Sequence, residues 1–329
     1  MKNILIIGAT GSTGLYLTDY LKNGNYKVFA TGNKSRPTNY FINNCIEYFQ
    51  IDLKDKASFD QLPRNKIDVV ILLAGSMPAR MKGYDPYEYL DTNIKGTLNV
   101  LEYCKTQNIP KIIYALSHSD VAGYWNTGLA IKEDFPPKLN LKGDHAVYII
   151  SKLTAVNLIE HYHLDYGIKK VIFRLPTIYG YWPDSLMFVD GKPKEIGYLK
   201  LINKAIKGED IEIWGNPKVS KDIVYVKDFI QLIENAINIE NANGLFNVGS
   251  GIATTLEEQI MGIIDVFSPS YKKSKIIYRP EKPTQTSYIY DISRAKELLN
   301  YQIKFPYKVM LEDMKQEMQN PMFSQLFSL

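Results

Sequence analysis

The stretch KNILIIGATGSTG, residues 2–14, decides the fold. Its apolar run over residues 4–7 is typical of a short strand that is buried on both faces of a parallel sheet. Three glycines at intervals of three residues follow the run, and the amphipathic segment 15–22 then predicts a helix. A second apolar strand is expected over residues 27–30. The order of strand, glycine turn, helix and strand indicates an α/β fold with a doubly wound parallel sheet.

The three glycines have different uses in such a unit. Gly8 permits a tight turn, Gly11 lets the backbone approach a pyrophosphate, and Gly14 lets the helix pack closely on the strand. The amide donors at the start of the helix face the phosphate charge. The sequence therefore predicts a Rossmann-type dinucleotide site, with a Rossmann-like sheet that has lost its ligand as the alternative. The cofactor contacts expected from this stretch are Gly8, Thr10, Gly11, Ser12, Thr13 and Gly14.

Composition limits the class of protein. The chain has 329 residues, long enough for one or two domains, and its 39 basic and 35 acidic residues give a net charge of +4. No dense basic stripe is present, so nucleic acid is not an expected partner. Cys45 and Cys104 lack a metal-like spacing and suggest a reducing compartment, and we expect no metal site. The apolar run at the N-terminus is too short for a membrane span, so we expect a soluble cytoplasmic protein with no membrane partner.

The end of the second strand favours one form of the cofactor. An NAD site usually has an acid there to accept hydrogen bonds from the adenosine ribose. This chain has Gly32 and Asn33 instead, followed by Lys34 and Arg36. A neutral strand end followed by cations can hold a 2′-phosphate, so we expect NADP in preference to NAD. The alternative is that both cations are ordinary solvated turn residues.

Three further strand ends continue the pattern. A strand over 46–51 ends at Asp52, a strand over 69–73 ends at Ala74, and a strand over 111–116 ends at Ser117. A long helix is expected over 84–107, where apolar residues recur at helical spacing. Further cofactor contacts are expected from Asn33, Arg36, Asp52, Leu53, Leu73, Ala74, Gly75 and Asn93.

A tyrosine and a lysine four residues apart carry the clearest chemistry. Tyr148 and Lys152 lie on one face of a predicted helix and can point towards one site. A tyrosine with its ordinary pKa of about 10 is a poor base at neutral pH. A nearby ammonium and the positive nicotinamide ring favour the phenolate, which makes Tyr148 a workable general acid/base. Lys152 can also hold the nicotinamide ribose, whereas a plain helix-surface pair is the alternative.

With these motifs in place, the chain resembles the extended short-chain dehydrogenases/reductases of the NAD-dependent epimerase/dehydratase family, in its nucleotide-sugar branch. The resemblance covers nearly the whole length and is specific for the family but not for one reaction. It rests on Gly8-x-x-Gly11-x-x-Gly14, Asp52-Leu53, Asn93-x-x-Gly96-Thr97, Tyr148-x-x-x-Lys152, the segment 174–180 (RLPTIYG), the segment 222–228 (DIVYVKD), the segment 247–251 (NVGSG) and Arg279-Pro280.

The resemblance implies a division of the chain and of its tasks. Residues 1–180 would form the NAD(P)-binding domain, to which 222–250 return, and 181–329 would mainly form a smaller α/β substrate lobe. Tyr148 and Lys152 would be the catalytic pair, and Pro176 would contribute to the cofactor site. A nucleotide sugar is the implied substrate, and a homodimer is an assembly that we consider.

The hydroxyl position of the family is altered in this chain. Members usually carry Ser or Thr three residues before a valine, and here His118 stands there, before Val121. Ser117 and Ser119 flank it and can take over the hydrogen bond to the substrate oxygen, or the histidine can polarise a carbonyl itself. We expect one of Ser117, His118 and Ser119 to act, and structural packing of His118 is the alternative. The acidic pair of the dehydratases is reduced to Asp120 alone, which argues against dehydration.

Two further departures concern the expected grip on the nucleotide. Thr177 stands where many members have Asn, and Lys221 stands where many have Arg. A lysine keeps the charge but loses the fork that binds phosphate through two hydrogen bonds. Arg279 is retained as a pyrophosphate ligand, with a surface arginine as the alternative.

The expected activity is that of an NAD(P)-dependent nucleotide-sugar epimerase. An NADP-dependent sugar or ketone reductase on the same fold is the first alternative. A regulator that senses NADP(H) without turnover is an alternative from another class, because fold alone does not separate these functions.

Overall fold

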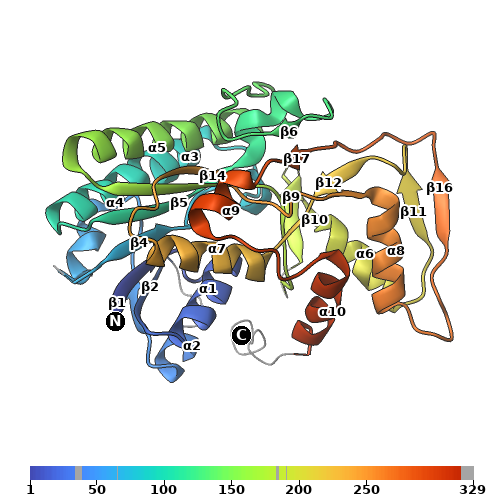
Figure 1. The fold of residues 1–329 in the computed structure, drawn as a ribbon, viewed down its shortest axis with the longest axis horizontal. Helices are drawn as coiled ribbons and strands as arrows, with labels where there is room; N and C mark the ends of the chain where they lie inside the picture. Colours follow the sequence, from blue (N-terminus) through green and yellow to red (C-terminus); the bar gives the residue numbers. More distant parts are fainter. Residues whose placement is uncertain (34–38, 65, 183–184, 190, 320–329) are drawn as a thin grey trace.

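The computed structural model describes residues 1–33, 39–64, 66–182, 185–189 and 191–319. Its centre is a seven-stranded parallel sheet in the order β14-β7-β5-β4-β1-β2-β3 (Figure 1). The predicted doubly wound sheet is therefore confirmed. The strands are β1 (Lys2–Ile7), β2 (Tyr26–Gly32), β3 (Glu47–Gln50), β4 (Val69–Leu72), β5 (Lys111–Ser117), β7 (Lys169–Leu175) and β14 (Gly244–Asn247).

Helices cover both faces of this sheet (Figure 1). One face carries α4 (Gly96–Thr106) and α5 (His145–Tyr166), and the other carries α1 (Ser12–Lys22) and α7 (Val226–Asn238). The short helices α2 (Asn39–Asn43), α3 (Pro86–Tyr89) and α9 (Ser293–Leu299) lie around this core. Among the described residues, no helix is both long and apolar enough to cross a membrane.

The strand order reverses between β1 and β4, which are adjacent in the sheet. Strands β2 and β3 extend the sheet on one side of this point, and β5, β7 and β14 extend it on the other. In open α/β sheets, ligands bind outside the carboxyl ends of the strands at such a switch point. The turns after β1 and β4 are therefore where a ligand is expected.

The C-terminal half adds a smaller group of elements beside the sheet (Figure 1). Its helices are α6 (Gly197–Ile206), α8 (Leu256–Phe267) and α10 (Tyr307–Glu317). Among the described residues, ten short strands outside the large sheet form five pairs, one of which includes β6 from the N-terminal half. The pairs are β9 (Leu186–Val189) with β10 (Lys192–Glu195), β11 (Ile211–Trp214) with β16 (Ile276–Arg279), β12 (Ser220–Asp222) with β15 (Ala253–Thr255), β13 (Val224–Tyr225) with β8 (Ile178–Tyr179), and β17 (Ile289–Tyr290) with β6 (Ala130–Ile131).

Two expectations about the elements need correction. The helix expected over 84–107 is divided into α3, a π-helical turn over Leu90–Lys95 and α4. Residues 222–226 were expected to return to the large sheet, but β12 and β13 pair with β15 and β8 instead. Only β14 of this region joins the sheet, beside β7.

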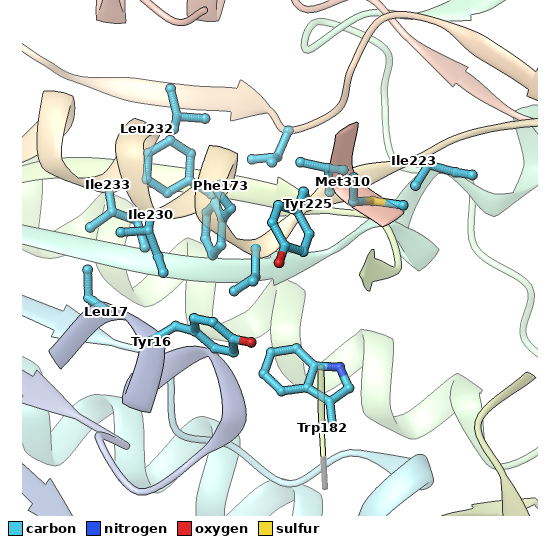
Figure 2. Close-up of a cluster of buried hydrophobic side chains, with 14 of the residues drawn as sticks. Tyr16, Leu17, Phe173, Trp182, Ile223, Tyr225, Ile230, Leu232, Ile233 and Met310 are labelled. Atoms are coloured by element: carbon cyan, nitrogen blue, oxygen red, sulfur yellow. The ribbon is translucent and has the colours of Figure 1, made fainter. Parts of the chain in front are cut away.

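Aromatic side chains join the two halves of the molecule. Tyr16 of α1 packs edge-on against Trp182, with their ring centroids 5.4 Å apart. Figure 2 shows this pair next to Tyr225 of β13 and Met310 of α10. Both rings and both other side chains are at least nine-tenths buried. Burial of this size stabilises each side chain by about 1.5–3 kcal/mol, so the C-terminal elements are part of the core of the sheet domain.

Three lysines from the starts of parallel strands bind the end of one helix. Lys2 of β1 donates to the carbonyl of Ile237 at 2.7 Å, and Lys111 of β5 donates to Ala236 at 2.9 Å and Ile239 at 2.7 Å. Lys169 of β7 donates to the carbonyl of Glu240 at 3.1 Å. The last carbonyls of a helix lack intrahelical partners and carry partial negative charge, so cations stabilise the end of α7.

Candidate active site

The glycine turn lies against the end of the neighbouring strand. Gly8 has a φ of +96°, and a Cβ atom there would come within 2.7 Å of the Ala74 nitrogen. A Cβ atom on Gly14 would lie 2.1 Å from the Gly8 carbonyl oxygen. The turn therefore requires glycine at both positions, as its conformation and the close packing of α1 demand.

Helix α1 begins at Ser12, and its N-cap residue is Gly11, which has no side chain to cap the helix. No acidic residue lies in its first turn. The first amides of a helix have no intrahelical acceptor, so those of Ser12, Thr13 and Gly14 are available to an anion. The predicted phosphate-binding residues thus lie together at the switch point of the sheet.

The end of β4 is joined to the glycine turn. The amides of Leu73 and Ala74 both donate to the Ile7 carbonyl, at 2.9 and 3.0 Å. A Cβ atom on Gly75 would lie 2.8 Å from Asn93 Oδ1 and 3.8 Å from Lys152 Nζ. The turn after β4 therefore lies next to the side chains of Asn93 and Lys152, the predicted catalytic lysine.

Asn93 connects the loop after β4 to helix α5. Its Oδ1 accepts from the Ser76 amide at 2.9 Å, and its Nδ2 donates to the Ser76 carbonyl at 3.0 Å. The same Nδ2 donates to Ser151 Oγ at 2.9 Å, and Ser151 Oγ donates to the Tyr148 carbonyl at 2.7 Å. Asn93 thereby positions the backbone that carries Tyr148. Sequence reasoning missed Ser76 and Ser151, although Ser151 falls on the helix turn between Tyr148 and Lys152.

Tyr148 and Lys152 both lie on α5 at the carboxyl edge of the sheet. Burial raises the pKa of the Tyr148 phenol, and hydrogen bonding with the Ser117 side chain opposes that rise. Burial lowers the pKa of the Lys152 ammonium to about 7. Lys152 Nζ lies 4.2 Å from the centroid of the Tyr114 ring. The expected lowering of the tyrosine pKa by the ammonium is therefore not seen in the chain alone, where the cost of burying a phenolate is larger.

The structure separates the three residues that compete for the hydroxyl role. Ser117 ends β5 and is the one that acts on the Tyr148 phenol. Its Oγ also donates to Ser119 Oγ at 3.2 Å and accepts from the Ser119 amide at 3.3 Å. Ser119 therefore supports the Ser117 side chain.

His118 lies in an aromatic cluster formed by Trp125, Tyr288 and Tyr290, whose ring centroids are 4.8, 5.0 and 6.1 Å from that of the imidazole. Its Nδ1 shares a hydrogen bond of 2.8 Å with the Tyr290 hydroxyl. Burial lowers the pKa of His118 to about 3, so the ring is neutral at physiological pH. Sequence reasoning missed the cluster because Tyr290 is 172 residues away.

Asp120, the single acid left in the dehydratase position, is buried in an ion pair. The Arg174 Nε donates to both carboxylate oxygens at 3.0 Å, and the exposed fractions of the two side chains are 2% and 1%. Arg174 also donates to Asn247 Oδ1 at 3.0 Å. The carboxylate therefore fixes the turn His118–Tyr124 to β7, and this agrees with the argument against dehydration.

The remaining cofactor residues lie at the ends of β2, β3 and β7. Asn33 is exposed after β2, whereas Lys34 and Arg36 lie outside the described residues. Asp52 Oδ1 accepts from the Lys54 amide at 2.9 Å, and the Leu53 carbonyl accepts from Asn99 of α4 at 2.8 Å. Pro176 is buried directly after β7.

The three predicted substrate residues are spread over the C-terminal side. Thr177 is exposed after β7 and hydrogen-bonds with Tyr288, a member of the aromatic cluster. Lys221 Nζ donates to Gln285 Oε1 at 3.0 Å. Arg279 Nε donates to Glu212 Oε1 at 3.0 Å on β11, in the pair of strands at the outer edge of the molecule (Figure 1). Arg279 is thus engaged in a surface ion pair, with 44% of its side chain exposed.

Comparison with known proteins finds relatives of similar sequence and similar fold. A putative UDP-glucose 4-epimerase of Methanocaldococcus jannaschii is 29% identical, over 90% of this chain and 92% of the relative. The structure of UDP-N-acetylglucosamine 4-epimerase from Bacillus cereus superposes with a TM-score of 0.77 at 25% identity, over 97% of this chain and all of that one. UDP-glucose 4-epimerase of Thermotoga maritima, solved with UDP-glucose, gives a TM-score of 0.78 at 22% identity, covering 97% of this chain and 100% of that one.

The family itself is identified by its sequence model. The model described as "NAD dependent epimerase/dehydratase family" matches residues 4–249, which is most of the chain and includes the glycine turn and the Tyr148/Lys152 pair. The resemblance stated from the motifs is confirmed. On this match, and with a fold that agrees with it, the chain belongs to the NAD-dependent epimerase/dehydratase family.

Proposed function

We propose that this protein is a nucleotide-sugar epimerase that inverts one carbon of a UDP-sugar. The observation that carries the proposal is the placement of Tyr148 beside Ser117 at the carboxyl ends of the strands, next to the turns after β1 and β4. An acid/base and a cofactor cradle at one edge are what reversible oxidation of a sugar hydroxyl requires. Two of the relatives above, a putative UDP-glucose 4-epimerase and a UDP-N-acetylglucosamine 4-epimerase, support carbon 4 as the inverted centre.

The residues present fit a nicotinamide dinucleotide. The turn at Gly8 and Gly14 has no room for a Cβ atom, and the first amides of α1 are available to the pyrophosphate. A bound nicotinamide cofactor would supply reversible hydride transfer, which allows the oxidised sugar carbon to be reduced on either of its faces. We propose NADP as the preferred form, because neither Gly32 nor Asn33 bears a negative charge that would repel a 2′-phosphate. Relatives solved with NAD, such as the UDP-glucuronic acid 4-epimerase of Bacillus cereus, leave this preference to be measured.

Tyr148 is the group that moves the proton. Its phenolate takes the proton from the sugar hydroxyl as the carbon is oxidised, and the phenol returns it when the carbon is reduced. Ser117 hydrogen-bonds the Tyr148 phenol and opposes the rise in its pKa that burial causes, while Lys152 supplies positive charge when protonated. Burial keeps water from competing for these protons. We also propose that the nucleotide of the substrate is bound by Thr177, Lys221 and Arg279.

The same proposal covers the organisation of the protein. Residues 1–180, with 222–250, would bind the cofactor, and 181–329 would mainly bind the sugar nucleotide. A cytoplasmic location and a homodimer remain predictions.

The test is an assay of purified protein with UDP-glucose, UDP-N-acetylglucosamine and UDP-glucuronic acid, each with NAD or NADP. Epimerisation would appear by nuclear magnetic resonance as a second sugar, with no net reduction of the added cofactor. Steady consumption of reduced cofactor with a ketone or ketose would instead identify a reductase. Cofactor binding without either reaction would identify a sensor. The comparisons do not favour these two alternatives.

A further inference from the structure

The volume that an acid would fill at the end of β2 is occupied by the side chains of Thr10 and Tyr48. A Cβ atom on Gly32 would lie 2.6 Å from Thr10 Oγ1 and 2.7 Å from the hydroxyl oxygen of Tyr48. Tyr48 comes from β3, where its Cα pairs with Ala30, two residues before Gly32. Residues two apart on a strand share one face of the sheet, so the long Tyr48 side chain extends along that face to the strand end.

The Tyr48 ring is held firmly in this position. It stacks on Phe41 of α2 with centroids 5.0 Å apart and an interplanar angle of 18°. Phe41 itself is 1% exposed and belongs to the main core. The orientation of the hydroxyl is therefore determined by packing before any ligand binds.

The Tyr48 hydroxyl is buried, and no group among the described residues hydrogen-bonds it. A buried polar group without a partner is destabilising, and natural structures retain few of them. Burial also raises the pKa of Tyr48, so the hydroxyl keeps its proton and can donate. An orphaned donor beside the glycine turn indicates a ligand oxygen as its partner.

We propose that the Tyr48 hydroxyl donates a hydrogen bond to the 2′-oxygen of the adenosine ribose and so replaces the acid usually found at the end of the second strand. The inference rests on the proposed dinucleotide function and names the residue that recognises this part of the cofactor. A neutral donor binds a 2′-hydroxyl and does not repel a 2′-phosphate, whereas a carboxylate does repel it. Tyr48 thereby permits NADP at a site whose acidic counterpart would exclude it.

The test compares the parent protein with Tyr48→Phe, which removes only the oxygen. Calorimetric titration would measure the binding of NAD, NADP and an NAD analogue with 2′-deoxyadenosine. We expect Tyr48→Phe to bind NAD and NADP about tenfold more weakly, the scale of one lost hydrogen bond. The deoxy analogue should bind both proteins equally, because it has no 2′-oxygen to lose.

Stability of the unliganded protein gives an independent readout. Removing an unpaired buried hydroxyl should leave the thermal midpoint of Tyr48→Phe equal to or above that of the parent. The matched control is Tyr40→Phe on the neighbouring helix α2. The Tyr40 hydroxyl hydrogen-bonds Asp19 and accepts from Lys22 at 3.2 Å. This control should lower the thermal midpoint and leave the affinity for all three dinucleotides unchanged.

Two results would overturn the inference. The first is equal affinity of the parent and Tyr48→Phe for NAD and NADP, with epimerisation intact, which leaves the proposed function standing. The second is equal affinity of the parent for NAD and its deoxy analogue, which needs no variant at all. Failure of the parent to bind any dinucleotide would overturn the proposed function together with the inference.

Discussion

Single residues at the end of β5 determine how the acid/base is supported. Ser117 acts on the Tyr148 phenol, while His118, at the position of the family hydroxyl, is held by Tyr290 and an aromatic cluster. We expect Ser117→Ala to lower kcat by the equivalent of about 3 kcal/mol, the usual effect of losing one donor to developing oxyanion charge. The limb of the pH–rate profile on which the rate rises as the phenolate forms should move to higher pH, because the variant removes the interaction that lowers the pKa of the Tyr148 phenol.

His118→Ala should behave differently. It removes the hydrogen bond to Tyr290 and the contacts with two other rings, so the thermal midpoint should fall while kcat changes less than in Ser117→Ala. His118→Ser should not restore the loss, since a serine cannot fill the cluster. A fall in kcat that is larger for His118→Ala, with recovery in His118→Ser, would assign the hydroxyl role to position 118.

Removal of the phenol oxygen of Tyr148 tests its proposed role as the general acid/base. Tyr148→Phe should lower kcat by about 10²- to 10⁴-fold, the usual contribution of a general acid/base, and should leave cofactor affinity unchanged. Stopped assays of epimerisation and calorimetric titration would give the two values. Near-normal turnover would remove Tyr148 from the mechanism.

How far the sequence predicts this site depends on the distance between partners. Tyr148 and Lys152 could be predicted as a pair because residues four apart share a helix face, and the structure places both on α5. The choice between Ser117 and His118 depends on Tyr290 and Tyr288, which are brought together only by tertiary packing. The same holds for Tyr48, whose hydroxyl reaches the site from the edge strand.

At the scale of the elements, Lys111, which binds the end of α7, has a pKa in a range that experiments can reach. Burial and, to a smaller extent, the charges of Lys2 and Lys169 lower the pKa of Lys111 to about 8. The unfolded value is near 10.5, so the unfolded chain binds more protons between pH 8 and 10.5. The penalty of charging Lys111 is fully present below pH 8 and is lost as the pH rises through this window.

The prediction is that the free energy of unfolding of the parent, relative to Lys111→Met, rises between pH 8 and 10.5. Urea titrations at several pH values would measure the difference. The control is Lys275→Met, at an exposed lysine of the C-terminal lobe, which should follow the parent. Parallel curves for the parent and Lys111→Met would show that Lys111 has an ordinary pKa.

Element boundaries were predictable where one physical signal dominates. Apolar runs marked β1, β2, β4 and β5 because strands of a parallel sheet are buried on both faces. The π-helical turn Leu90–Lys95 was not predicted, since one extra residue hardly changes helical spacing over so short a segment. Its consequence is local, because it positions Asn93 between Ser76 and Ser151.

For the whole molecule, the motifs predicted the family and the sheet correctly, and the match over residues 4–249 confirms the family. The path of the chain after residue 180 was less predictable. Short strands such as β12 and β13 have no periodicity that tells a large sheet from a two-stranded pair. Their place in the fold is determined by the strands with which they pair, β15 and β8.

The contacts between the strand lysines and the end of α7 join parts of the chain that are synthesised at different times. Lys2 is synthesised well before its acceptor, the Ile237 carbonyl, which is 235 residues later in the chain. The face of the sheet that α1 covers in part is therefore completed only when α7 has emerged (Figure 1). A fragment ending at residue 180 would lack this helix and β14 permanently. Expressed alone, it should expose apolar surface to a hydrophobic dye, whereas a chain ending at residue 319 should not.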